Sequence, residues 1–426
     1  MLLAPLSVAV AFAQRGGVFR ASRDHPAIEY STGPLRDRVS ELNRRIEEGT
    51  VQLRFERASG YLLSTLEALD VPIESQVVVF SPTSFQARRI DPRNPRAVFF
   101  NDTAAVGWVR GGEVLEVATQ DPQQGVIFYS LNQVPEDKPQ FRRNENCLAC
   151  HLSWDTLGVP GLFVLSTFPM PEDKNAYAAG GVSDHRSRFD ERWGGWYVTG
   201  GTSSVPHIGN IVRKPDTAES SLGRPSVALE SLDRVFDTEG YLSRYSDVVA
   251  LMVLEHQTHM INLITRIGWE TRLALYQARA MNTLGEPAGE RDAIAAAIRD
   301  SAAELVDYLL FVDEAPLAGK IQGSSGFAER FPAPGPRDRR GRSLRELDLE
   351  RRLMRYPCSY MIYSAAFDAL PAVAKAAIYE RLWQILSGQE RHDSYNSFSL
   401  ADRQAIVEIL LDTKKDLPDY FQPVTR

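Results

Sequence analysis

The spacing of apolar positions changes along the 426-residue chain from helical to β-rich and back to helical. Between residues 34 and 69, Val39, Leu42 and Ile46 recur at helical spacing with charged residues between them, which predicts helix. Residues 71–133 instead hold short runs rich in Val, Ile, Phe and Tyr, separated by turn clusters. These runs predict antiparallel strands at 76–81, 97–101, 105–110 and 125–132, and two further strands are expected at 161–166 and 194–201.

Helical spacing dominates the second half of the chain. Residues 245–279 carry apolar side chains three and four positions apart and contain no proline, so we expect one long helix with a break at Gly268. The stretch 327–341 is rich in Pro, Gly and Arg and predicts a loop. Further helices are expected at 290–311, 344–370, 373–388 and 399–413. The pattern therefore predicts an α+β fold, with a β-containing N-terminal half and a mainly helical C-terminal half.

The same pattern suggests four segments. They are a signal peptide at 1–13, an N-terminal helical segment at 14–70, a β-rich region at 71–232 and a helical region at 233–426. Residues 1–13 (MLLAPLSVAVAFA) are apolar and end in Ala-Phe-Ala, which is typical of a secretory signal peptide cleaved before Gln14. No Lys or Arg precedes the apolar run, so either the true start lies upstream or the terminal amine alone supplies the positive charge. The alternative to a signal peptide is a short buried helix or strand. Cleavage would place the protein in the periplasm or elsewhere outside the cytoplasm.

The net charge and the hydropathy of the chain limit the classes of partner that it can bind. The formal net charge of −7 argues against nucleic acid, because nucleic acids select for basic surfaces. After the N-terminus, no apolar run approaches the roughly 18 residues that span a bilayer, so we expect no transmembrane segment in the mature chain.

The strongest chemical signal is the sequence Cys147-Leu-Ala-Cys150-His151. It matches C-x-x-C-H, the attachment signature of c-type haem. Two thiols on one helical turn reach the two vinyl groups on one edge of the porphyrin, and the next residue places an imidazole under the iron. The motif therefore predicts one covalent haem c, with His151 as the proximal iron ligand.

Two other interpretations of the motif stay open. A structural zinc site normally has four ligands, and beyond the motif the chain offers Cys358, four scattered histidines and one His-x-x-His pair. A redox-active dithiol is the third interpretation. Cys358 has no free cysteine partner if the first two are used, and we expect it to be a small buried side chain.

The motif is similar to that of class I c-type cytochromes, over little more than its five residues. In that class the second ligand is typically a downstream Met, but Met170 lies between two prolines that restrict its backbone. A wider pattern, CLACH followed by TLGVPG, DHR, RWGGWYVTG and PHIGN, resembles a group of uncharacterised bacterial cytochrome-c-like proteins. This resemblance implies haem attachment on the outer side of the bacterial inner membrane and defines no substrate.

Three histidines are candidates for the second iron ligand. His207 ranks first because its Pro-His-Ile-Gly context lets backbone approach a flat cofactor, and His256 and His259 follow on the long helix. Glu255 beside them gives a polar group on an apolar helix, which needs hydrogen bonds, ion pairs or a metal. A satisfied core network is the alternative for these residues. Candidate partners for the haem propionates are Arg186, Arg188, Arg192 and Arg213.

Two functions follow from a haem in this chain. The first is electron transfer with a redox partner protein. The second is a haem-dependent oxidoreductase whose iron has an open or displaceable sixth site, with Glu255, His256 and His259 supplying acid–base chemistry. The sequence shows no recognisable peroxidase or oxygenase constellation, which favours electron transfer.

Overall fold

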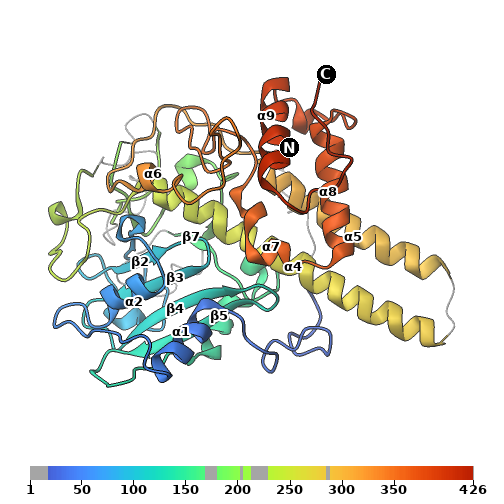
Figure 1. Cartoon of the computed structure of the whole chain (residues 1–426). Coiled ribbons are helices and arrows are strands. Elements are labelled where there is room, and N and C mark those ends of the chain that lie inside the picture. The colour runs from blue at the N-terminus through green and yellow to red at the C-terminus, as the bar shows by residue number, and fades with distance from the viewer. Residues whose placement is uncertain (1–17, 168–179, 202–204, 213–228, 285–287, 426) are drawn as a thin grey trace, which may run out of the picture.

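A computed structural model describes residues 18–167, 180–201, 205–212, 229–284 and 288–425. The expected signal peptide at 1–13, Met170 and Arg213 lie outside these residues. The described part confirms the α+β class, because strands occupy the N-terminal half and long helices the C-terminal half. Figure 1 shows the sheet on one side of the molecule and the paired C-terminal helices on the other.

The main sheet has seven strands in the order β6-β5-β4-β3-β2-β1-β9, and every pairing between them is antiparallel. Its strands are β1 (Val77–Val79), β2 (Arg96–Phe100), β3 (Ala104–Val109), β4 (Val114–Asp121), β5 (Gly125–Asn132), β6 (Arg142–Arg143) and β9 (Trp196–Tyr197). A separate two-stranded sheet pairs β7 (Val164–Ser166) with β8 (Gly181–Ser183). No strand was expected at the position of β4, and the strand expected at 194–201 is reduced to the two residues of β9.

The helices are α1 (Arg38–Glu47), α2 (Leu62–Ala68), α3 (Leu148–His151), α4 (Val248–Leu284), α5 (Ala288–Leu309), α6 (Phe327–Arg330), α7 (Ala365–Asp368), α8 (Ala372–Leu386) and α9 (Leu400–Thr413). The helices expected at 290–311, 373–388 and 399–413 are confirmed with small shifts of their ends. None of the helices in the described ranges combines the length and apolarity that crossing a bilayer requires.

Three helical predictions need correction. The segment at 34–69 forms two short helices instead of one, and the loop expected at 327–341 begins with the single turn α6. The helix expected at 344–370 is wrong except for α7. There the Asp348 carboxylate accepts hydrogen bonds from the backbone N–H groups of Glu350 and Arg351, and Leu349 has a positive φ of 60°. This side-chain capping competes with the helix.

The expected break at Gly268 is absent, and α4 runs through it for 37 residues. A β-carbon added at Gly268 would lie 3.3 Å from a methyl carbon of Leu370. Glycine at this position therefore lets the segment around Leu370 approach α4 closely.

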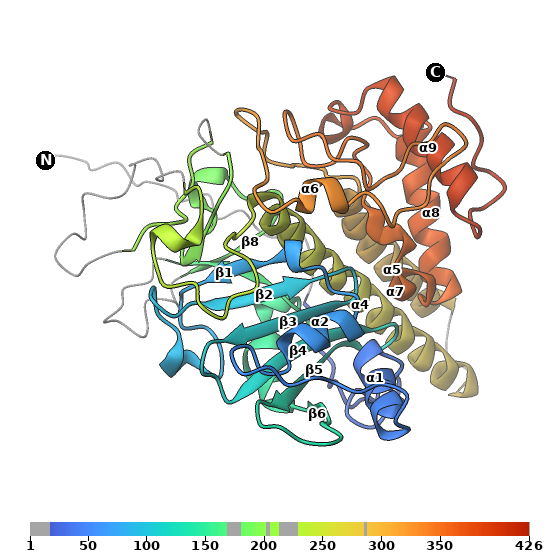
Figure 2. The ribbon, with the colours of Figure 1, turned by 60° about the vertical axis from the view of Figure 1, so that its left-hand side comes forward.

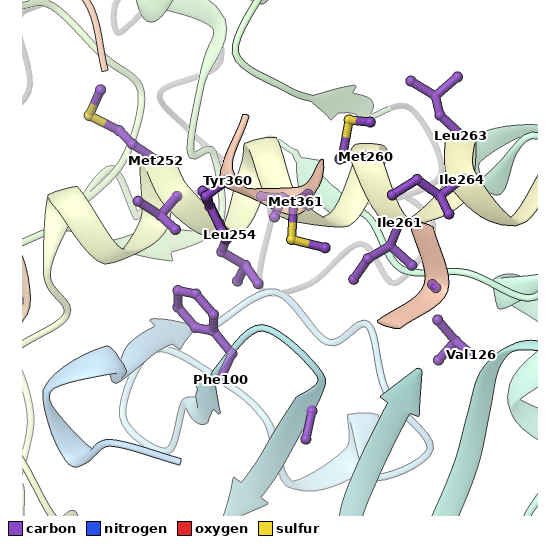
Figure 3. Close-up of a cluster of buried hydrophobic side chains, with 14 of the residues drawn as sticks. Phe100, Val126, Met252, Leu254, Met260, Ile261, Leu263, Ile264, Tyr360 and Met361 are labelled. Carbon is purple, nitrogen blue, oxygen red and sulfur yellow. The ribbon is translucent and has the colours of Figure 1, made fainter. Parts of the chain in front are cut away.

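The two faces of the main sheet carry different layers, as Figure 2 shows with α1 and α2 in front of the sheet and α4 behind it. On one face, the Tyr129 hydroxyl donates to the carboxylate of Asp37, the residue that caps α1. On the other face, α4 packs on alternate strand residues, and Figure 3 shows Leu254 directed toward Phe100 and Ile261 toward Val126. The long helix α4 thus lies between the sheet and the C-terminal helices.

Candidate haem-attachment site

The C-x-x-C-H motif lies on a short helical turn anchored to the main sheet. The Asn144 backbone N–H donates to the carbonyl oxygen of Phe128 on β5, directly after β6 has paired with that strand. Residues 145–147 then form a 3-10 turn, and α3 continues it to His151. Cys147 is half-buried and Cys150 is exposed, so the two thiols lie at the edge of the protein surface.

His151 is held by one hydrogen bond and two aromatic rings. Its Nδ1 lies 2.9 Å from the carbonyl oxygen of Gly161. Because a carbonyl oxygen only accepts, Nδ1 carries the proton and Nε2 keeps its lone pair. The rings of Phe128 and Phe163 lie 4.9 Å and 5.1 Å from the imidazole. Burial lowers the pKa of His151 to about 4, so the imidazole is neutral at pH 7, as metal binding requires.

The Gly161 peptide is itself fixed from α4. The Gly161 N–H donates to the carbonyl oxygen of His151 over 3.0 Å, so the two residues are joined twice. The next residue, Leu162, exchanges two hydrogen bonds with the side chain of Asn262, which is fully buried on α4. A β-carbon at Gly161 would lie 2.0 Å from the Asn262 Oδ1, so only glycine fits.

The thiol of Cys147 is poorly suited to ionise. Burial raises its pKa to about 12, and the nearby carboxylate of Glu116 adds to the effect. A redox-active dithiol needs the opposite, because its attacking cysteine has a lowered pKa. Cys358 is fully buried in the hydrophobic core, as expected, and burial raises its pKa as well.

The histidines of α4 belong to a second, buried group. His256 Nδ1 lies 2.8 Å from the Nδ1 of His185, and His256 Nε2 lies 2.7 Å from the Ser359 hydroxyl. The His185 ring also stacks on Tyr308 at 4.1 Å, while its Nε2 is buried without a hydrogen-bond partner among the described residues. Both nitrogens of His256 are therefore engaged by protein groups.

Ion pairs complete this buried group. Arg192 lies 3.2 Å from the Glu255 carboxylate, and burial raises the pKa of Glu255 to about 7 against the lowering effect of that arginine. Arg186 pairs with Asp184 at 2.6 Å and reaches within 3.3 Å of His259 Nε2. Of the expected propionate partners, Arg192 is thus already paired inside the protein, Arg186 is paired while about one-third exposed, and Arg188 pairs with Asp190 on the surface.

His207 is also buried. Its Nδ1 accepts a hydrogen bond from the Gly209 N–H, and its ring lies 4.9 Å from the ring of Trp193. Burial lowers the pKa of His207 to about 4. The ring contacts of His151 are with Phe128 and Phe163, whereas His185, His256 and His259 each contact Tyr308. The choice of second ligand stays a prediction.

Sequence reasoning missed Gly161 and Asn262, the residues that fix His151. Asn262 gave a weak signal, as an amide within the apolar spacing of the long helix. Across the described ranges, no three His, Cys, Asp or Glu side chains converge with the geometry of a metal site.

Comparison with known proteins does not assign the chain to a family. No protein-family model, curated protein or solved structure matches the chain.

Proposed function

We propose that this chain is an exported c-type cytochrome that carries one covalent haem and transfers electrons. Cys147 and Cys150 would hold the haem by thioether bonds, and His151 would ligate its iron. When bound, a haem supplies one-electron oxidation and reduction at its iron.

The tautomer of His151 carries the proposal. Its Nδ1–H donates to the Gly161 carbonyl, so the Nε2 lone pair is available. A hydrogen bond of this kind from the other ring nitrogen is what orients a metal-ligating histidine. The motif spacing and the neutral imidazole agree with this assignment. The high pKa of the Cys147 thiol argues against a redox-active dithiol.

The exposure of the motif at the protein surface supports a role in electron transfer. Cys150 is exposed and the Trp154 side chain is 71% exposed, so this edge of the site is open to a redox partner protein. The apolar leader and the haem chemistry together support a periplasmic location, which N-terminal sequencing of the mature protein at Gln14 tests.

The decisive experiment is the intact mass of protein made in cells that mature c-type cytochromes. We expect the mass of one haem to stay with the denatured chain, and iron instead of zinc by metal analysis. C147A/C150A should lose the attached haem, whereas C358A, which changes the buried third cysteine, should keep it. Colour that acid–acetone extracts completely from the wild-type protein would contradict the proposal.

A haem-dependent oxidoreductase is the second candidate function. The buried group around Glu255, His185 and His256 favours it, because acid–base side chains of this density are costly to bury. Carbon monoxide distinguishes the two functions. A large spectral change on adding it to the reduced protein would favour an open iron site and the enzyme.

A further inference from the structure

A small cavity lies between the main sheet and α4, next to Leu162. Ala105 on β3 and Ala118 on β4 pair directly, and Ala105 also pairs with Phe100, whose side chain faces α4 (Figure 3). Paired residues share a face of the sheet, so the two short alanine side chains also face α4 and leave space beneath the helix. A water molecule has about 10 Å³ in this cavity, which is about the least that one water needs and excludes a larger ligand.

The wall of the cavity is mostly apolar, but two glutamines line it from opposite sides. Gln120 on β4 pairs with Val126, which faces α4, so the Gln120 side chain points to the same face. Its Nε2 is buried and has no hydrogen-bond partner in the described part of the chain. Gln257 comes from α4, where its Nε2 donates to the Asn101 carbonyl and its Oε1 accepts from the Tyr360 hydroxyl at 2.7 Å. An amide oxygen has two lone pairs, so Gln257 Oε1 can accept a second hydrogen bond.

The polar groups of this lining favour a bound water over a dry cavity. Purely apolar cavities stay dry, whereas a buried water molecule bonds to buried polar groups that are otherwise unsatisfied. Gln120 offers a donor and Gln257 an acceptor, and the two amides do not bond directly, because Gln120 Nε2 has no partner among the described residues. A water molecule can accept from the first and donate to the second. Thr103, which also lines the cavity, adds a third polar residue.

We propose that this cavity binds one structural water molecule, which accepts a hydrogen bond from Gln120 Nε2 and donates one to Gln257 Oε1. The water would connect β4 to α4 beside the segment that holds His151, since Leu162 lines the cavity and the preceding Gly161 accepts the hydrogen bond of His151. This bridge depends on the chain's own residues and not on haem attachment.

A crystal structure of the intact protein, at a resolution that shows ordered solvent, tests the water directly. We expect one ordered water molecule in the cavity, within hydrogen-bond distance of Gln120 Nε2 and Gln257 Oε1. Methionine has nearly the same length as glutamine and carries no donor. The Gln120→Met protein should therefore lack this water.

The urea midpoint of unfolding gives a second test, because a wet and a dry cavity predict different changes. If the water is bound, Gln120→Met removes a satisfied hydrogen bond and the midpoint should fall. If the cavity is dry, the same substitution removes a buried donor that has no acceptor, and the midpoint should not fall. We expect the fall.

Gln140→Met is the matched control. Gln140 Nε2 is also buried without a hydrogen-bond partner among the described residues, but Gln140 does not line this cavity. We therefore expect no fall of the midpoint in Gln140→Met. The proposal would be overturned by a wild-type crystal structure without water between the two amides, by a midpoint that does not fall in Gln120→Met, or by an equal fall in both variants.

Discussion

The side-chain amide of Asn262 makes two hydrogen bonds with the backbone of Leu162, 100 residues earlier in the chain. Its Oδ1 accepts from the Leu162 N–H at 3.1 Å, and its Nδ2 donates to the Leu162 carbonyl at 2.7 Å. Because the preceding residue, Gly161, accepts the hydrogen bond of His151, the long helix α4 positions the proposed iron ligand. The same helix carries Glu255, His256 and His259, so α4 contacts both the segment that holds His151 and the buried group.

The first prediction concerns Asn262→Ala. The substitution leaves two backbone groups of Leu162 without partners, so we expect the free energy of unfolding to fall by about 1–3 kcal/mol. The Gly161 carbonyl would also be held less firmly. The hydrogen bond from His151 would weaken, the imidazole would donate less electron density, and the reduction potential should rise.

Gln257→Ala is the matched control for this substitution. Gln257 is another buried amide on α4, and it makes two hydrogen bonds of 2.7 Å, to the Asn101 carbonyl and from the Tyr360 hydroxyl. It should lose similar stability in urea unfolding and leave the potential unchanged. Equal shifts of potential in the two variants would mean that Asn262 acts through stability alone.

The second prediction concerns Gly161→Ala. A β-carbon there would lie 2.0 Å from the Asn262 Oδ1, so the amide must move and its two hydrogen bonds weaken. We expect a loss of about 1–3 kcal/mol, the usual cost of overpacking. In the Asn262→Ala background the two closest atoms are gone and only the Thr156 Cβ at 3.1 Å stays tight, so Gly161→Ala should cost less there. Additive losses in the double-mutant cycle would show that the two residues act independently.

Local spacing predicted much of the fold, because helices such as α5, α8 and α9 follow from the periodicity of their own residues. It failed at 344–370, where the Asp348 side chain takes the hydrogen bonds that a helix would use, and at Gly268, where packing on Leu370 explains the glycine. The three motif residues could be predicted because they lie within five consecutive positions of the sequence.

The residues that surround the motif could not be predicted in this way, because they come from distant segments of the chain. The sequence could not place Asn262 beside Leu162, or Glu116 beside Phe128, since the first contact depends on tertiary packing and the second on strand register. The same holds for His185, which meets His256 only in the folded protein.

The third prediction concerns Glu314, whose pKa burial raises to about 7, with the Leu353 N–H bond acting against it. A raised carboxyl pKa means that the folded state binds the extra proton, so its stabilising effect is present below about pH 4.5 and is lost as the pH rises through 7. Glu314→Gln removes this pH dependence. Relative to the wild type, the variant should gain stability from pH 4.5 upward, on the order of 1–3 kcal/mol above pH 7.

Urea unfolding at a series of pH values measures this effect. Glu350→Gln, at an exposed glutamate that pairs loosely with Lys320 at 3.6 Å, is the control for loss of a surface carboxylate. A Glu314→Gln difference that stays constant from pH 4 to 8 would contradict the prediction.

The last prediction concerns the sixth iron ligand. His207 stays the first candidate because His256 would have to give up its bonds to His185 or Ser359 before it could bind iron, and breaking such buried bonds costs about 1–3 kcal/mol each. We therefore expect His207→Ala to keep the covalent haem and to gain binding of carbon monoxide in the reduced state, which an absorption spectrum detects. His256→Ala, the comparison, should lose stability without that gain. Carbon monoxide binding by His256→Ala alone would transfer the assignment to α4, and binding by the wild-type protein would show that the iron has an open site.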